Sequence, residues 1–275
     1  MKKNKRIFGK ICMILSLVFF YLPIICVVVF SFNGSKSLTV MKGFSLQWYE
    51  RLFRDKQMME SVYTTVLVAV IATVVSTIAG TLAAVGLSKS RRVVRDLVLQ
   101  INDFPIMNPE IVTAIGLMLF FITVGVERGL LTMILAHIAF CIPYVILSVM
   151  PKIRSLDPNL ADAAMDLGAT PWQALIKVIV PQIMPGVFSG ALIAFTMSFD
   201  DFIISYFVTG RGVKNLSIMV YTMSKRVNPT INAISSLIIG VITLILLIIN
   251  IIPFVRDRMI AKKKAAEAAA VAKEQ

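Results

Sequence analysis

The sequence predicts an all-α integral membrane protein with six transmembrane helices. Hydrophobic residues make up 57% of the chain and charged residues only 16%, whereas soluble domains contain about 45–50% apolar residues. A helix needs about 20 mostly apolar residues to cross a bilayer. Six stretches of this kind are found, at residues 8–32, 61–88, 104–124, 129–151, 183–208 and 230–255. They use most of the 275 residues, so no room remains for a soluble catalytic or ligand-binding domain.

The basic residues predict which side of the membrane each loop occupies. The net charge is +13, and with the N-terminus inside, 18 of the 28 Lys and Arg residues fall on the cytoplasmic side. This is the positive-inside bias that orients membrane proteins. The basic clusters at 2–6, 89–92 and 256–264 therefore anchor the topology beside anionic lipid, and nucleic-acid binding is not expected. Both termini are predicted to be cytoplasmic.

Residues 1–60 are predicted to form an N-terminal transmembrane helix and an outer loop. The first apolar stretch follows basic residues, as in a signal peptide, but it is long and no small-x-small cleavage site precedes Phe32. We therefore expect an uncleaved first span. Trp48 and Tyr49 in the loop suit the boundary between water and lipid. A short helix on the outer surface would bring several apolar residues to one face: Leu46, Tyr49, Leu52 and Phe53. It could serve membrane anchoring or partner contact.

The third and fourth stretches carry polar features at membrane depth. Pro105, Pro109 and Glu110 lie near the start of the third stretch, and this combination predicts a broken or cavity-lining helix. His137, the single histidine, lies in the fourth stretch. We expect it to be a packed, hydrogen-bonded structural residue.

The residues that catalysis or a cofactor would need are not found. With one His, a His-based metal cluster or nucleophilic triad has little support, and the three Cys residues lie in predicted spans without metal or redox spacing. The sequence G-x-x-x-x-G-K-[ST], which binds ATP phosphates, does not occur. We expect a non-enzymatic transport chain without a cofactor. Its energy must come from a separate ATPase or from an ion gradient.

A polar segment at 152–182 separates the fourth and fifth stretches. Asp157 can cap a short helix that has Pro158 in its first turn, and Gly168 can end that helix in a left-handed conformation. Thr170 can cap a second helix, with Pro171 at its first position and Gln173 completing a capping box. Pro181 should interrupt the pattern again. The segment therefore predicts two short helices with a fixed bend at Gly168.

The spacing within this segment resembles the cytoplasmic signature loop of binding-protein-dependent ABC importer permeases. The matching positions are Asp162, Ala163, Ala164, Gly168, Val178, Val180 and Pro181. The one departure is Asp162, where Glu is usual. The resemblance implies a type I ABC importer permease fold, with 61–255 as the core permease domain, 152–182 as its cytoplasmic coupling loop and 256–275 as a cytoplasmic tail. It also implies that the loop, with Thr170 and Pro171 in its bend, docks on an ATPase.

Asp200 and Asp201 are adjacent carboxylates inside the fifth apolar stretch. An acid at membrane depth costs about 2.5–3.5 kcal/mol on insertion scales, so such residues usually face a cavity or a cation. Phe199, Phe202 and Tyr206 could flank a bound cation, because aromatic faces attract ammonium groups. We take Asp201 as the more important acid and include Glu110 in the same substrate pathway. The other interpretation is a membrane-boundary pair, or an acid that pairs with a partner subunit.

The segment from Ser198 to Gly210 most resembles the polyamine branch of the importer family, the spermidine/putrescine permeases of the PotC type. The matching positions are Ser198, Asp200, Asp201, Ser205, Phe207, Val208, Thr209 and Gly210. The resemblance implies a system in the bacterial cytoplasmic (inner) membrane. Its partners would be an extracytoplasmic polyamine-binding protein, a second, PotB-like permease subunit and a cytoplasmic ABC ATPase dimer, all around the lipid bilayer.

Three other functions remain open at this point. The chain could serve an importer for ferric iron, thiamine or a phosphonate, although two carboxylates suit anionic solutes poorly. It could be a secondary transporter or channel, but such a carrier has no need of a loop that docks on an ATPase. It could also be a membrane scaffold, which loss of solute uptake on deletion would exclude.

Overall fold

The computed structural model describes residues 2–37, 40–210, 212–224, 228–244 and 247. The chain divides into two compact units, one formed by Met1–Asp55 with Met223–Gln275 and the other by Lys56–Thr222. All described regular elements are helices, as the composition predicts. Four of them are long and apolar enough to cross a membrane, and a bent pair makes a fifth candidate span.

The first unit begins with α1 (Lys2–Ser31), of which Gly9–Ser31 can span a membrane as predicted. A short helix is found where the sequence predicts one, α2 (Gln47–Arg54), but its buried face differs from the prediction. Trp48 is buried and donates a hydrogen bond from Nε1 to the Asn33 carbonyl at 2.6 Å, whereas Phe53 is exposed. Within this unit the apolar helix Thr230–Leu244 forms part of the sixth predicted stretch. The rest of that stretch and the predicted tail at 256–275 lie outside the described residues.

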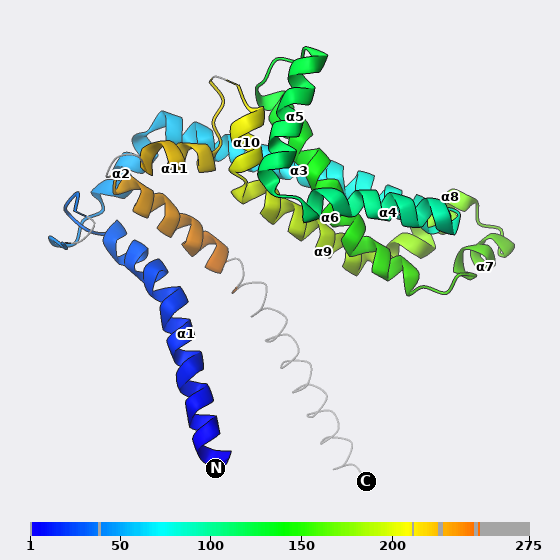
Figure 1. The fold of residues 1–275 in the computed structure, drawn as a ribbon, viewed down its shortest axis with the longest axis horizontal. Helices are drawn as coiled ribbons and strands as arrows, with labels where there is room; N and C mark the ends of the chain where they lie inside the picture. The colour runs from blue at the N-terminus through cyan, green and yellow to red at the C-terminus, as the bar shows by residue number, and fades with distance from the viewer. Residues whose placement is uncertain (1, 38–39, 211, 225–227, 245–246, 248–275) are drawn as a thin grey trace, which may run out of the picture. The chain divides into compact units, whose positions relative to one another are not determined.

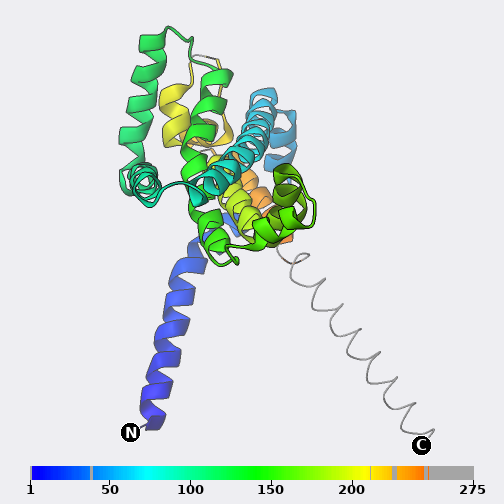
Figure 2. The same ribbon diagram turned by 90° about the vertical axis from the view of Figure 1, so that its right-hand side faces the viewer.

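The core of the second unit is built by three long helices, α3 (Lys56–Ser88), α6 (Leu130–Arg154) and α9 (Val180–Asp200), which pack against one another (Figures 1 and 2). A Cβ added at Gly80 of α3 would lie 2.8 Å from the Cβ of Val145 on α6. Small residues of this kind let helix backbones approach closely in membranes, where packing replaces the hydrophobic effect as the driving force.

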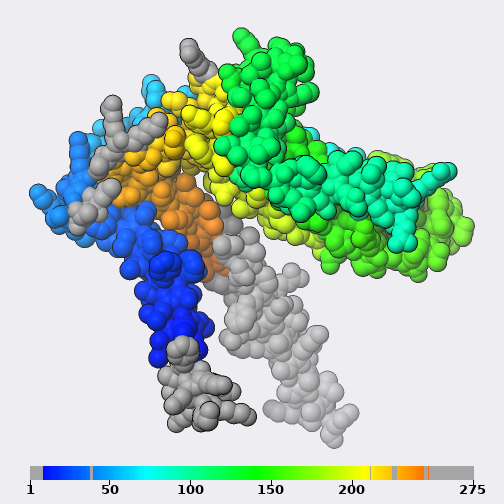
Figure 3. Space-filling model, in the orientation of Figure 1, coloured from blue at the N-terminus to red at the C-terminus, as the bar shows by residue number. Residues whose placement is uncertain are grey.

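The third predicted span is broken, as its prolines indicated. It consists of α4 (Arg92–Met107) and α5 (Glu110–Val124), whose axes differ by 105°. Pro105 lies inside α4, and the break falls at Asn108 and Pro109. The two helices cover the face of the second unit that is turned toward the viewer in Figure 3.

The fifth predicted span is also interrupted. The helix α9 ends at Asp200, and a short helix, α10 (Ile203–Val208), follows after two residues. The next helix is α11 (Leu216–Ser224). Because α10 packs against α5, the broken ends of two spans lie in the same region of this unit.

Candidate functional site

The polar segment after α6 forms an elbow whose first arm is α7 (Leu160–Asp166). Asp162 and Ala163 are exposed on this arm, and Ala164 is half-buried. The helix begins two residues later than Pro158, so Asp157 is not its cap. Instead the Asp157 carboxylate accepts a hydrogen bond from the Asn159 N–H at 2.9 Å.

The bend at Gly168 has the predicted conformation. Its φ is +87°, in the left-handed region where residues with a side chain are disfavoured. The N–H groups of Gly168 and Ala169 donate to the carbonyls of Met165 and Ala164, at 2.9 and 3.1 Å. These bonds satisfy the last carbonyls of α7, as a left-handed cap does.

The second arm starts with the predicted capping box. The Thr170 hydroxyl accepts from the Gln173 N–H at 3.3 Å, and the Gln173 side chain accepts from the Thr170 N–H at 2.9 Å. Pro171 holds the first helical position of α8 (Pro171–Ala174). The two helices and the bend were therefore predictable from local chemistry.

The predicted interruption at Pro181 is wrong. The arm continues through a π-helical turn, η1 (Leu175–Ile179), into α9, so that 171–200 runs as one helix. Pro181 lies at the start of α9. A π-turn shifts the backbone hydrogen bonds by one residue. A proline after such a turn can therefore be accommodated without ending the helix. The elbow thus has one separate short helix, and its second arm is rigidly continuous with a core helix.

Two large apolar side chains on the elbow are exposed. Leu167 is 90% exposed and Trp172 is 62% exposed, on either side of the Gly168 bend. Exposed apolar groups on a polar segment that follows a span are typical of a contact surface for another protein. Neither residue was predicted from the sequence as a contact.

The structure separates the roles of the two adjacent aspartates. The Asp201 side chain is buried and accepts three hydrogen bonds from the first turn of α10. The donors are Ile204 N–H at 3.1 Å, Ser205 N–H at 2.7 Å and Ser205 Oγ at 2.7 Å. It therefore acts as a cap that satisfies the free N–H groups at the start of α10.

Three further side chains complete a buried polar network around Asp201. Nε2 of His137, on α6, lies 3.3 Å from Asp201 Oδ2 and 2.9 Å from Ser205 Oγ, while its Nδ1 lies 2.6 Å from Ser198 Oγ. The Asn215 amide donates to the Asp201 carbonyl and to Ser205 Oγ, both at 2.9 Å. The network joins α9, α10 and α6 across the break.

Counting donors assigns a proton to His137 Nε2. The single hydroxyl hydrogen of Ser205 is used on Asp201, so the contact with His137 needs a proton on Nε2. His137 is thus the packed, hydrogen-bonded residue that the sequence analysis expects.

Asp200, in contrast, is exposed at the end of α9. An aromatic group lies in the same region: the ring of Phe202 is 5.4 Å from that of Tyr206 and 4.8 Å from that of Tyr221, between centroids. Tyr206 and Tyr221 are 50% and 43% exposed. Phe199 belongs elsewhere, because it stacks on Phe195 at 5.7 Å. Tyr221 was not predicted from the sequence, because it lies on α11 and joins the group only through the fold.

Glu110 lies in the first turn of α5 and is exposed. Beside it is a recess of only about 10 Å³, lined among others by Pro105, Tyr144 and Ile204, which is too small for a ligand. Within the described residues, no three His, Cys, Asp or Glu side chains form a group that could hold a metal ion.

The sequence of residues 76–264 matches the family described as "Binding-protein-dependent transport system inner membrane component". The chain belongs to this family. It is a multi-pass membrane permease, the transport component of its system. The resemblance to ABC importer permeases and the type I importer fold are both confirmed.

Curated relatives of this permease cover most of its length. The putrescine transport system permease protein PotI of Escherichia coli (strain K12) is 37% identical over 244 residues, which cover 86% of each chain. The spermidine/putrescine transport system permease protein PotC of Haemophilus influenzae is 35% identical over 84% of this chain and 90% of its own. Both are named as permeases and not as enzymes.

A solved structure supports the fold. A bacterial ABC transporter involved in the import of the acidic polysaccharide alginate matches with a TM-score of 0.70, over 90% of this permease and 96% of that chain, at 19% identity.

Proposed function

We propose that this chain is the permease subunit of an ATP-driven polyamine importer in the bacterial cytoplasmic membrane. Its relatives are named for putrescine and spermidine transport, and the exposed Asp200 beside a partly exposed aromatic group carries the proposal. A carboxylate with aromatic faces is the chemistry that binds an alkylammonium group. The chain forms half of the translocation pathway, and a second, PotB-like permease forms the other half.

The elbow is the site of coupling in this proposal. The bend at Gly168 and the exposed Leu167 and Trp172 present a shaped surface, which a cytoplasmic ABC ATPase dimer contacts. An extracytoplasmic binding protein delivers the polyamine at the opposite side. Both termini are then cytoplasmic, in agreement with the distribution of Lys and Arg.

The two aspartates have different roles. Asp200 and Glu110 are exposed and available to a polycation, whereas the Asp201 carboxylate already accepts three hydrogen bonds inside the protein. Burial therefore favours Asp200 over Asp201 as the direct contact, the reverse of the order inferred from sequence. Asp201 holds the break in place.

The test measures uptake of labelled putrescine and spermidine by proteoliposomes that contain the complete importer. Asp200→Asn removes one charge at constant size, and we expect the KM for polyamine to rise about tenfold or more, since hydrogen bonds to charged groups contribute about 1.5–3 kcal/mol. Glu127→Gln, an exposed acid in the loop before α6, is the matched control. Thiamine and ferric iron serve as competing solutes.

Two results would contradict this assignment. Unchanged polyamine uptake by Asp200→Asn at matched protein level would remove Asp200 from the pathway. Competition by thiamine or iron, with no transport of polyamines by the unmodified importer, would exclude the polyamine function and favour another solute. Asp201→Asn should instead lower the amount of folded permease, because it weakens the cap of α10.

A further inference from the structure

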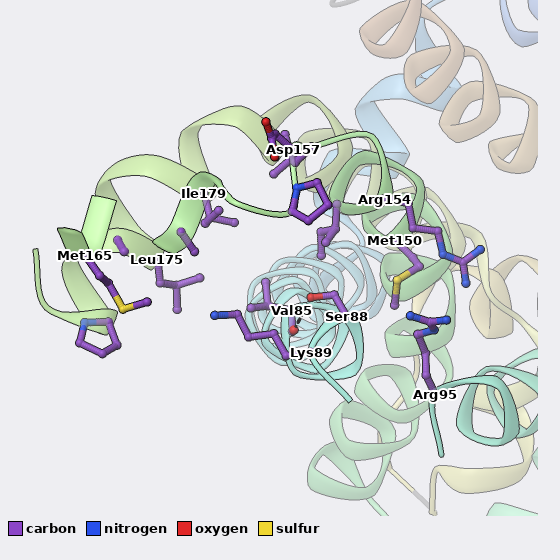
Figure 4. Close-up of a pocket in the computed structure, with 16 residues that line it drawn as sticks. Val85, Ser88, Lys89, Arg95, Met150, Arg154, Asp157, Met165, Leu175 and Ile179 are labelled. Carbon is purple, nitrogen blue, oxygen red and sulfur yellow. Dashed lines mark hydrogen bonds between the residues drawn. The ribbon is translucent and has the colours of Figure 1, made fainter. Parts of the chain in front are cut away.

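A cavity of about 450 Å³ lies between the elbow and the ends of the core helices of the second unit. Its walls come from the C-terminal ends of α3 and α6, the start of α4, and the elbow from Asp157 to Ile179 (Figure 4). Its volume falls within the range of about 300–1,000 Å³ that is usual for small-molecule sites. It is separate from the carboxylate and aromatic site described above.

Three cationic side chains line this cavity: Lys89, directly after α3, Arg95 on α4 and Arg154 on α6. Figure 4 draws Arg95 and Arg154 on one side, with Lys89 extending on the other side toward Leu175. The one carboxylate in the lining is Asp157, and it already accepts the Asn159 N–H. The cavity therefore carries an excess of positive charge.

Arg95 has one long ion pair and a buried Nε without a hydrogen bond in the described part of the chain. The ion pair joins this Nε to Asp96 Oδ1 at 3.5 Å. In the same described residues, neither Lys89 nor Arg154 forms an ion pair. A buried charged donor whose ion pair is too long for a hydrogen bond can bind a closer anion, and guanidinium groups suit phosphate oxygens in particular.

The remaining wall is apolar. Val85, Met150, Leu175 and Ile179 line it, and they belong to helices whose bodies can span a membrane. A small soluble anion would leave this surface uncovered. An amphiphile with an anionic head and a hydrocarbon chain covers both parts of the lining.

We propose that this cavity binds an anionic phospholipid. Its phosphate lies between Arg95 and Arg154, Lys89 adds favourable charge, and one acyl chain lies along the apolar wall. The lipid comes from the cytoplasmic leaflet, so this placement rests on the orientation given under the proposed function, but not on the identity of the transported solute. Because the cavity joins the elbow to α3, α4 and α6, the bound lipid ties the coupling surface to the core.

The test uses the full-length permease, purified in detergent, and native mass spectrometry with three probes. These are phosphatidylglycerol, zwitterionic phosphatidylcholine, and glycerol 3-phosphate as a soluble phosphate. The double variant Arg95→Gln/Arg154→Gln removes the phosphate contacts. The control Arg91→Gln/Arg92→Gln removes two exposed charges nearby that do not line the cavity. Thermal unfolding verifies that each variant is folded.

We expect one phosphatidylglycerol to be retained by the unmodified chain and by the control. The cavity variant should bind it about 30-fold more weakly, at roughly fivefold for each charge lost. A phosphatidylglycerol with a photoreactive acyl chain should label peptides that contain Val85, Met150 or Leu175.

Equal retention by all three proteins, or labelling elsewhere, would overturn the proposal. If glycerol 3-phosphate binds as tightly as the lipid, the ligand of this cavity is a soluble phosphate and the lipid proposal is wrong. Transport data are not needed, so failure here leaves the polyamine proposal intact.

Discussion

Replacing Gly168 by Val tests whether the shape of the elbow transmits force. At φ +87°, an added Cβ would meet no atom within 4 Å, so the substitution introduces no clash. The cost arises from the backbone alone, because a residue with a side chain in the left-handed region is strained by about 1–3 kcal/mol. A strain of that size lowers the ratio of native to alternative elbow conformations by roughly 5- to 150-fold.

The variants at this position should rank by their tolerance of positive φ. Asn visits the left-handed region most readily, Ala less so, and the β-branched Val least. We therefore expect coupling to decline in the order Gly, Asn, Ala, Val. Gly129→Val is the matched control, because it adds the same side chain into open space at φ −178°, an extended conformation that any residue adopts.

The assay compares three quantities for each variant: the amount of permease in the membrane, the ATPase retained on purification, and ATP-dependent uptake by the reconstituted importer. Gly168→Val should insert normally but lose most ATPase retention or uptake, and Gly129→Val should retain both. The reasoning fails if Gly168→Val transports at the normal rate at a normal protein level. It also fails if Asn, Ala and Val at 168 reduce uptake equally, since backbone strain predicts a graded loss.

Three further predictions follow from the packing, the capping box and the topology. Gly80→Ala should lower the thermal unfolding midpoint, because overpacking a helix contact costs about 1–3 kcal/mol, whereas Gly86→Ala on the same helix meets no atom within 4 Å and should not lower it. Thr170→Ala removes a cap worth about 1 kcal/mol and should weaken ATPase retention in a pull-down, less than Gly168→Val does. Reporter fusions at Gln47 should be extracytoplasmic and those at Trp172 cytoplasmic; the inverted pattern would contradict both the orientation and the coupling proposal.

Local signals predicted the elbow well. The left-handed Gly168 and the box formed by Thr170 and Gln173 depend only on residues within a few positions of one another, so their chemistry is readable in the sequence. Pro181 was misjudged because a proline ends a regular α-helix, while a π-turn five residues long precedes it here. Single-residue rules do not indicate where a helix widens.

The different burial of Asp200 and Asp201 could not be predicted from the sequence in the same way. If the segment were one continuous helix, Asp200 and Asp201 would be about equally suited to contact a cation. The break that buries Asp201 depends on His137 and Asn215, which lie 64 residues before it and 14 residues after it in the chain. The burial of Trp48 was not predictable either. An aromatic residue in an outer loop suits a lipid boundary, but the Trp48 side chain is buried and donates a hydrogen bond to the distant Asn33.

The two broken spans suggest why exposed acids are found where they are. Irregular backbone at membrane depth is tolerated only where its polar groups are satisfied or where it lines a cavity. At the α9–α10 break Asp201 satisfies the freed N–H groups from inside the protein. That internal cap leaves Asp200 without a capping role, and α10 packs against α5, whose first turn holds Glu110. The fold thus uses one carboxylate to stabilise the break and leaves two exposed near it, which is the arrangement that the proposed polyamine pathway requires.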